Sequence, residues 1–144
     1  MKGQKGITLV ALIITIIVML ILVAVTISVA LNGGLFDKAR TARRDTKGAQ
    51  VREAMALAKA DILSDYYANT EKGATDATQQ APTDTALAAA INSYLDGITV
   101  TTTKGQATST GTPYTVSSTD ADVTAYFAAH SGEDTITFSV WTNQ

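Results

Sequence analysis

The segment His130-Ser131-Gly132-Glu133-Asp134 brings together residue types that could do chemistry: a base, a hydroxyl and two carboxylic acids. These are the components of a nucleophilic or acid–base site, and His130 is the only histidine of the chain. Catalysis needs a defined spatial arrangement, however, and a short polar cluster before a β-like run is typical of a turn. The sequence therefore favours a turn here, and we expect a protein that is not an enzyme.

A second group with possible chemistry is the alternating pair Asp120 and Asp122, whose carboxylates could ligate a hard cation. Two acids without further ligands make a weak metal pattern. The chain has no cysteine, which excludes disulfides, thiol catalysis and thiolate metal sites. It also lacks a phosphate-binding glycine motif. We therefore expect neither a metal nor a cofactor.

The element that dominates the chain is an apolar run near its N-terminus. No charged residue lies between Lys5 and Asp37, and residues 7–31 contain only four polar side chains, all of them hydroxyls. At about 1.5 Å per residue, a helix over this run is about 37 Å long and can cross a hydrocarbon core of about 30 Å. Asn32, Gly33 and Gly34 then interrupt the pattern, which predicts a hinge or a helix end.

Charge is distributed unevenly around the formal net value of −2. Residues 37–59 carry seven Lys/Arg and three Asp/Glu, whereas residues 60–144 carry two Lys/Arg and ten Asp/Glu. Because the basic residues directly follow the apolar run, contact with a membrane surface or another subunit is their expected use, and we expect no nucleic acid partner. The positive-inside rule, applied plainly, would instead keep this basic segment in the cytoplasm.

Residues 35–144 predict a small α+β domain. Leu35, Ala39, Ala42 and Ala49, followed by Val51, Met55, Ala58, Ile62 and Tyr66, recur mostly every three or four residues and predict an amphipathic helix. An exposed loop is expected over 68–85, a short helix over 84–96 and an antiparallel sheet over 98–141. Strands are predicted at 98–103, 113–118 and 135–141, with Trp141 on the face opposite Phe138, and a helix at 120–129. The predicted fold is a long N-terminal helix, apolar and then amphipathic, packed on that sheet.

The N-terminus reads Met1-Lys2-Gly3-Gln4-Lys5-Gly6, then Ile7-Thr8-Leu9. A short basic leader that ends in glycine, followed by an apolar residue, threonine and leucine at the start of a long helix, resembles the type IV pilins and the pseudopilins of type II secretion systems. The local motif covers about six positions, and the layout of helix, loop and C-terminal sheet resembles the family over the whole chain.

This resemblance implies that residues 1–6 are a leader, that a prepilin peptidase cuts between Gly6 and Ile7, and that the new amine of Ile7 is methylated. Residues 7–34 would lie in the cytoplasmic membrane before assembly and in a filament core afterwards. A membrane platform and an assembly ATPase would be partners, and residues 35–144 would face the outside of the cell. The family's glutamate at the fifth mature position is replaced by Ala11, which leaves the amine of Ile7 without its usual partner.

The resemblance implies the function of a structural subunit in an extracellular filament, built by packing copies of the apolar helix. The packing residues expected in this core are Ile7, Leu9, Leu12, Ile13, Ile16, Ile17, Leu20 and Val23. Ala11 also fits a minor pilin or a pseudopilin, since some of these subunits lack the glutamate. The remaining alternative is a single-pass anchored or secreted surface protein, because Ser28-Val29-Ala30 resembles a signal-peptidase site.

Overall fold

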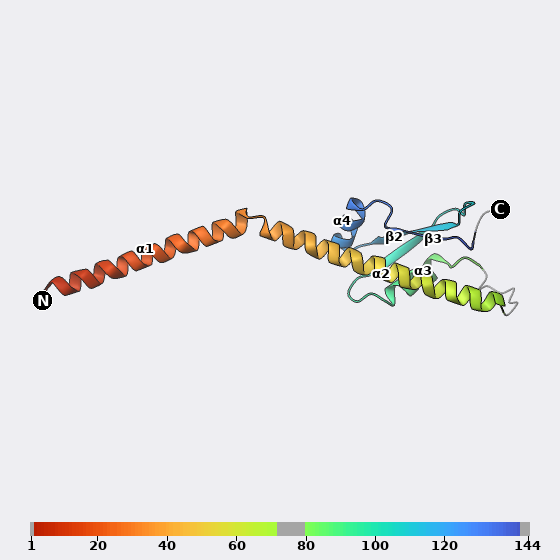
Figure 1. Ribbon diagram of the computed structural model, residues 1–144, viewed down its shortest axis with the longest axis horizontal. Helices are drawn as coiled ribbons and strands as arrows, with labels where there is room; N and C mark the ends of the chain where they lie inside the picture. Colours follow the sequence, from red (N-terminus) through yellow and green to blue (C-terminus); the bar gives the residue numbers. More distant parts are fainter. Residues whose placement is uncertain (1, 72–79, 142–144) are drawn as a thin grey trace. The chain divides into compact units, whose positions relative to one another are not determined.

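The computed structural model describes the backbone of residues 2–71 and 80–141, and the side chains of residues 5–69 and 80–141. The chain divides into two compact units, Met1–Ala42 and Arg43–Gln144. The first unit is helical, and the second combines helices with a three-stranded antiparallel sheet. Figure 1 shows the order of these elements along the chain. The predicted α+β class is confirmed.

The first unit contains helix α1, Lys2–Asn32, and the first turns of α2, Leu35–Glu71. The chain leaves the helix at Gly33, whose N–H donates to the Val29 carbonyl at 2.8 Å. Gly34 follows with φ of +66°, a left-handed conformation that glycine adopts without the steric cost of a Cβ. The interruption therefore falls at the glycines that the sequence indicated. Bending at Asn32–Gly34 stays a prediction.

In the second unit, α2 buries a narrow face made of Gly48, Val51, Ala54, Met55 and Ala58. Most of these positions are three or four residues from another member of the set, so they share one side of the helix. The predicted stripe is wrong at its start: Leu35, Ala39, Ala42 and Ala49 are exposed. Ala49 lies about 100° around the helix from Gly48, and Gly48 occupies the buried position instead.

The sheet has the order β1-β2-β3, with strands Val100–Lys104, Thr112–Ser118 and Thr135–Phe138. Both strand pairs are antiparallel, with Thr102 opposite Val116 and Tyr114 opposite Ile136. Alternate residues of each strand are buried, and they form one hydrophobic core with the buried face of α2. The sheet therefore has one face on the core, as its alternating pattern predicted.

The last strand is shorter than the sequence predicted. It ends at Phe138, so the alternation of faces stops before Trp141. The Trp141 ring lies 5.3 Å from that of Phe138 and 5.1 Å from that of Tyr66. The prediction that Trp141 faces away from the core is wrong, because the chain turns after Phe138 and brings the indole back to the core's edge.

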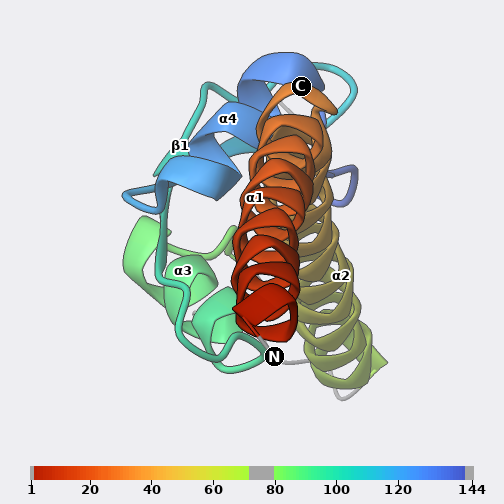
Figure 2. The same ribbon diagram turned by 90° about the vertical axis from the view of Figure 1, so that its left-hand side faces the viewer.

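Two short helices complete this unit, and Figure 2 shows both of them, with β1, on the same side of α2. Helix α3, Asp84–Asn92, starts at the N-cap Thr83, whose hydroxyl accepts from the Ala86 N–H at 3.2 Å. It ends four residues before the predicted limit. There the Asn92 amide accepts from the Val100 N–H and donates to the Val100 carbonyl, at 2.8 and 3.0 Å.

Helix α4, Ala121–Ala129, agrees with its predicted range and begins at the N-cap Asp120. It buries Val123 and Tyr126, while Phe127 is half-buried against the core. The predicted loop 68–85 starts too early, since α2 continues to Glu71. Residues 72–79 of that loop lie outside the described part of the chain.

Candidate functional site

Helix α1 is apolar on every side, and its apolar side chains are exposed. Its large apolar side chains are between 48% exposed at Val18 and 71% exposed at Ile7. The segment Lys5–Asn32 is long and apolar enough to cross a membrane, and none of its most apolar window is buried. A helix that is hydrophobic all round is stable only inside an apolar environment. The segment 7–31 therefore has the composition of a helix that lies in an apolar environment.

All eight predicted packing residues lie on this exposed helix, and no feature of the single chain separates them from their neighbours. Val10, Ile14, Met19 and Leu22 are as exposed as the predicted set. The predicted list named only some of the apolar residues of α1, whereas residues with the same chemistry surround the helix. Residues 7–31 have no polar face in the sequence, and this signal would have added the apolar residues on the other sides of the helix to the list.

The polar side chains within α1 bond back to their own helix. The hydroxyls of Thr15 and Thr26 donate to the carbonyls of Ala11 and Leu22, each at 2.7 Å. Asn32 donates through Nδ2 to Oγ of Ser28 at 3.2 Å. Bonds of this kind lower the cost of placing a hydroxyl in lipid, because no water is needed to satisfy the group. These residues are therefore compatible with an apolar surrounding.

The predicted processing site lies in the first turns of the same helix. Gly6 and Ile7 are both helical and exposed, and nothing lies within 4 Å of the position that a Cβ on Gly6 would occupy. A peptidase that cuts between them would therefore have to unwind this part of α1. Gly6 lowers that cost, because glycine is about 1 kcal/mol less favourable than alanine inside a helix.

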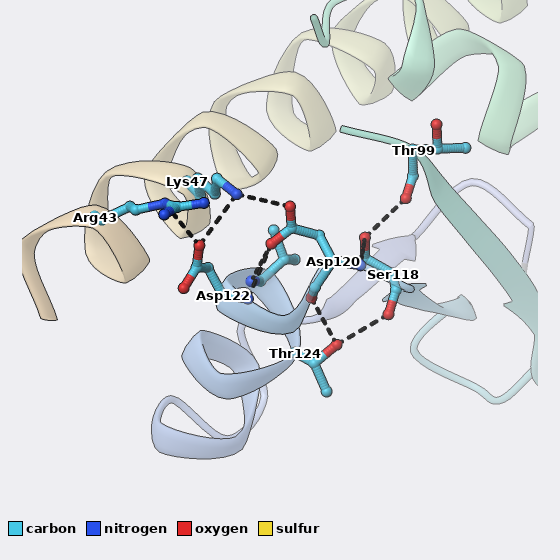
Figure 3. Close-up of polar contacts among 8 residues, drawn as sticks. Arg43, Lys47, Thr99, Ser118, Asp120, Asp122 and Thr124 are labelled. Atoms are coloured by element: carbon cyan, nitrogen blue, oxygen red, sulfur yellow. Dashed lines mark hydrogen bonds and ion pairs between the residues drawn. The ribbon is translucent and has the colours of Figure 1, made fainter. Parts of the chain in front are cut away.

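The structure brings the aspartate pair to the basic residues of α2 (Figure 3). Oδ2 of Asp120 lies 2.7 Å from Nζ of Lys47, and Oδ2 of Asp122 lies 3.1 Å from Nζ of Lys47 and 3.0 Å from Nε of Arg43. Oδ1 of Asp120 also accepts from the N–H groups of Asp122 and Val123, at 2.9 and 3.2 Å. The two acids thus join α4 to α2 through cations of the protein itself.

This ion cluster has defined electrostatic consequences. The pKa of Asp120 is lowered, mainly by the hydrogen bond from Lys47 and against the opposing effect of burial. The pKa of Lys47 is raised by its hydrogen bonds to Asp120 and then Asp122. Each partner therefore favours the charged form of the other. The arrangement is suited to holding two helices together.

The His130 segment forms the turn that its composition indicated. His130 is the C-cap of α4, its ring stacks on Tyr126 with centroids 4.1 Å apart, and its Nδ1 lies 3.0 Å from the Tyr126 carbonyl oxygen. Glu133 accepts from the Tyr126 hydroxyl at 2.6 Å and lies 3.5 Å from Nε of Arg52. Each of these contacts fastens the end of α4.

A close approach that sequence reasoning missed lies beneath this turn. A Cβ on Gly48 would lie 2.1 Å from Cγ of Tyr126, so only a glycine lets the aromatic ring rest on the α2 backbone. Gly48 stands in a run of helix-compatible residues, and an isolated glycine in such a pattern is the available signal for a packing role. The contact between the Tyr126 ring and the backbone at Gly48 thus packs α4 closely against α2.

The fold and these sites define an α+β protein whose one candidate membrane helix, among the described residues, could span a bilayer or act as a signal sequence. Compared with models of protein families, with curated proteins and with solved structures, the chain gives no match.

Proposed function

We propose that this protein is a structural subunit of an extracellular type IV pilus-like filament, assembled by packing α1 against copies of itself. The observation that carries the proposal is that α1 is apolar on all sides with exposed side chains, while the second unit has a core of its own. One chain thus holds a segment that needs apolar partners and a domain that does not. A filament of identical chains meets both requirements.

Cohesion in such a filament would come from burial of the α1 side chains. Relative to water, the gain is about 25 cal/mol for each Å² of apolar surface removed. Relative to lipid the gain is smaller, because acyl chains are already apolar. Transfer of α1 from the cytoplasmic membrane into the filament therefore needs work, which we assign to an assembly ATPase acting through a membrane platform.

Processing between Gly6 and Ile7 by a prepilin peptidase belongs to the same proposal, with methylation of the Ile7 amine. Ala11 leaves that amine without the carboxylate that pilins of this kind place at the fifth mature position. A minor pilin or a secretion-system pseudopilin is therefore the second candidate, and Ala11 is the observation that favours it. In either role the acidic second unit would face solvent.

The mature N-terminus tests the processing step. Mass spectrometry of the protein isolated from cells is expected to find a chain that begins at Ile7 and carries a methyl group. A chain that begins at Leu31 would instead identify a secreted protein whose α1 was a signal sequence. An intact Met1 would identify a single-pass anchor.

Assembly needs a separate experiment. Surface material sheared from cells and examined by cryo-electron microscopy is expected to contain filaments with α1 in their core. A low share of this chain among the filament subunits would indicate the minor-pilin role. Recovery of the protein only as detergent-soluble monomers would contradict the filament proposal.

A further inference from the structure

A shallow groove lies on the second unit, along the edge of the buried face of α2. Its α2 wall contains Glu53, Ala54 and Leu57, and its other wall contains Tyr94 and Asp96 from the segment after α3. Leu57 is 42% exposed and Tyr94 is 44% exposed, so the groove has an apolar floor that the chain leaves open. We call it the acidic groove.

The charged groups of the acidic groove are all carboxylates. Glu53 and Asp96 line it, and Asp61 accepts a hydrogen bond from the Tyr94 hydroxyl at its end. The salt bridges found among the described side chains involve other acids: Asp45, Asp120, Asp122 and Glu133. The groove therefore presents unpaired negative charge beside apolar surface.

The first turns of α2 present the opposite combination. Leu35 is 63% exposed and Phe36 is 57% exposed, although both lie beyond the glycine break that ends α1. Asp37, Lys38 and Arg40 follow, and none of the three makes a salt bridge with any side chain that the structure describes. We call residues 35–40 the neck segment. With two basic residues and one acidic residue, it pairs exposed apolar surface with a net positive charge.

We infer that the neck segment of one copy of this chain docks in the acidic groove of another copy. Phe36 and Leu35 would cover the floor at Leu57 and Tyr94. Lys38 and Arg40 would face the carboxylates of Glu53, Asp61 and Asp96. Charge complementarity of this kind selects a partner and sets its register.

The occupant cannot be the neck segment of the same chain. Residues 35–40 and the α2 wall of the groove belong to one helix, Leu35–Glu71, and a helix cannot fold back onto its own side. The two surfaces also differ from each other, so the contact is heterologous. A heterologous contact that does not close into a ring continues as an open helical filament. The inference thus rests on the proposed filament and describes how its subunits are aligned.

Engineered cysteines test the contact directly, because the native chain has none. Full-length protein carrying both Phe36→Cys and Leu57→Cys, expressed in its own cells and oxidised in surface filaments, is expected to give a ladder of disulfide-linked multimers. The matched control pairs Phe36→Cys with Thr103→Cys on the exposed side of β1. It should give no ladder. A ladder in the control with none in the test pair would overturn the inference.

Charge reversal supplies a second measurement that does not depend on disulfide geometry. Glu53→Lys with Asp96→Lys is expected to lower the filament yield about tenfold, because like charges would then face each other. Adding Lys38→Glu and Arg40→Glu to the same chain should restore the yield. Failure of this rescue, while filaments of the unaltered chain form normally, would overturn the inference and leave the filament proposal standing.

Three further outcomes would distinguish the docking inference from the filament proposal. Crosslinking of Leu57→Cys to a different protein would overturn the inference by assigning the groove to that partner. Absence of filaments from the unaltered chain would defeat the filament proposal, and the docking inference with it. Filaments that form without any neck–groove crosslink, and that tolerate the charge reversal, would defeat the docking inference alone.

Discussion

Helix α1 and the core of the second unit use similar apolar residues with opposite outcomes. In the core, Tyr114 and Phe138 are fully buried and their rings meet edge to face with centroids 5.6 Å apart. In α1, the large apolar side chains are 48% exposed or more. Apolar content by itself thus does not decide where a residue is buried. The core is buried within its own unit, whereas the apolar side chains of α1 are exposed.

The hydroxyl groups of the two regions differ in the same way. Those of Thr102 and Thr112 are buried and reach distant segments, donating to the carbonyls of Asp84 and Trp141 at 2.7 and 2.6 Å. Those of Thr15 and Thr26 reach only the preceding turn of α1. Hydrogen bonds from these hydroxyls connect distant segments of the second unit, whereas those of Thr15 and Thr26 stay within α1. The two regions should therefore respond independently to substitution.

The broadest expected effect, on both membrane insertion and filament formation, comes from a charge in the middle of α1. Ile17→Lys should cost about 2.5–3.5 kcal/mol of membrane insertion, because a lysine at the helix centre must carry its charge into an apolar surrounding. The share of the protein found in the membrane fraction and the number of surface filaments are both expected to fall sharply. The control Ile17→Leu should behave as the unaltered chain. Protease resistance of the second unit should be unchanged. Loss of that resistance would show that the two regions are coupled.

The matching substitution in the core is Phe138→Ala. It removes a fully buried ring and should lower the free energy of unfolding of the second unit by about 3–5 kcal/mol. Urea unfolding of the full chain in detergent, followed by fluorescence of the single tryptophan, measures this change. Tyr67→Ala, at a mostly exposed ring, should change it by no more than about 0.5 kcal/mol. Equal losses in both variants would contradict the described core.

Gly48→Ala tests the close packing of α4 on α2. The added methyl would gain about 1 kcal/mol of helix propensity. It would clash with the Tyr126 ring, and the net result should be a destabilisation of about 1–2 kcal/mol. Ala49→Leu, one residue further and exposed, should be nearly neutral. In the Tyr126→Ala background the same glycine substitution should no longer destabilise, and a persistent loss there would place the clash elsewhere.

The smallest expected effect is the acid sensitivity of the ion cluster. Because the pKa of Asp120 is lowered in the folded protein, its contribution to stability is complete above its ordinary value near 3.8. The contribution is lost as the pH falls through the lower folded value. Asp120→Asn keeps an N-cap oxygen but not the charge, so its stability should fall less steeply below about pH 4. Parallel urea midpoints for the two proteins between pH 5 and pH 2 would contradict this role.

Much of the fold could be predicted because its signals are local. The break at Gly33 and Gly34, the short helix Ala121–Ala129 and the alternation of Ile136 and Phe138 in β3 each depend on a few neighbouring residues. The errors arose where distant segments decide. Trp141 turns back because Phe138 and Tyr66 offer ring contacts, and α3 stops where the Asn92 side chain meets β1.

The candidate sites also differ in whether local sequence or contacts between distant segments determine them. The sequence by itself determined that residues 7–31 of α1 form a charge-free segment of membrane-spanning length, because hydrophobicity and length are properties of consecutive residues. Only the tertiary structure decided that Asp120 and Asp122 meet Lys47 and Arg43 of the protein itself. It also decided that Gly48 receives the Tyr126 ring and that Leu57 and Tyr94 lie open beside unpaired acids. These pairings join residues tens of positions apart, and no local pattern encodes the distance between them.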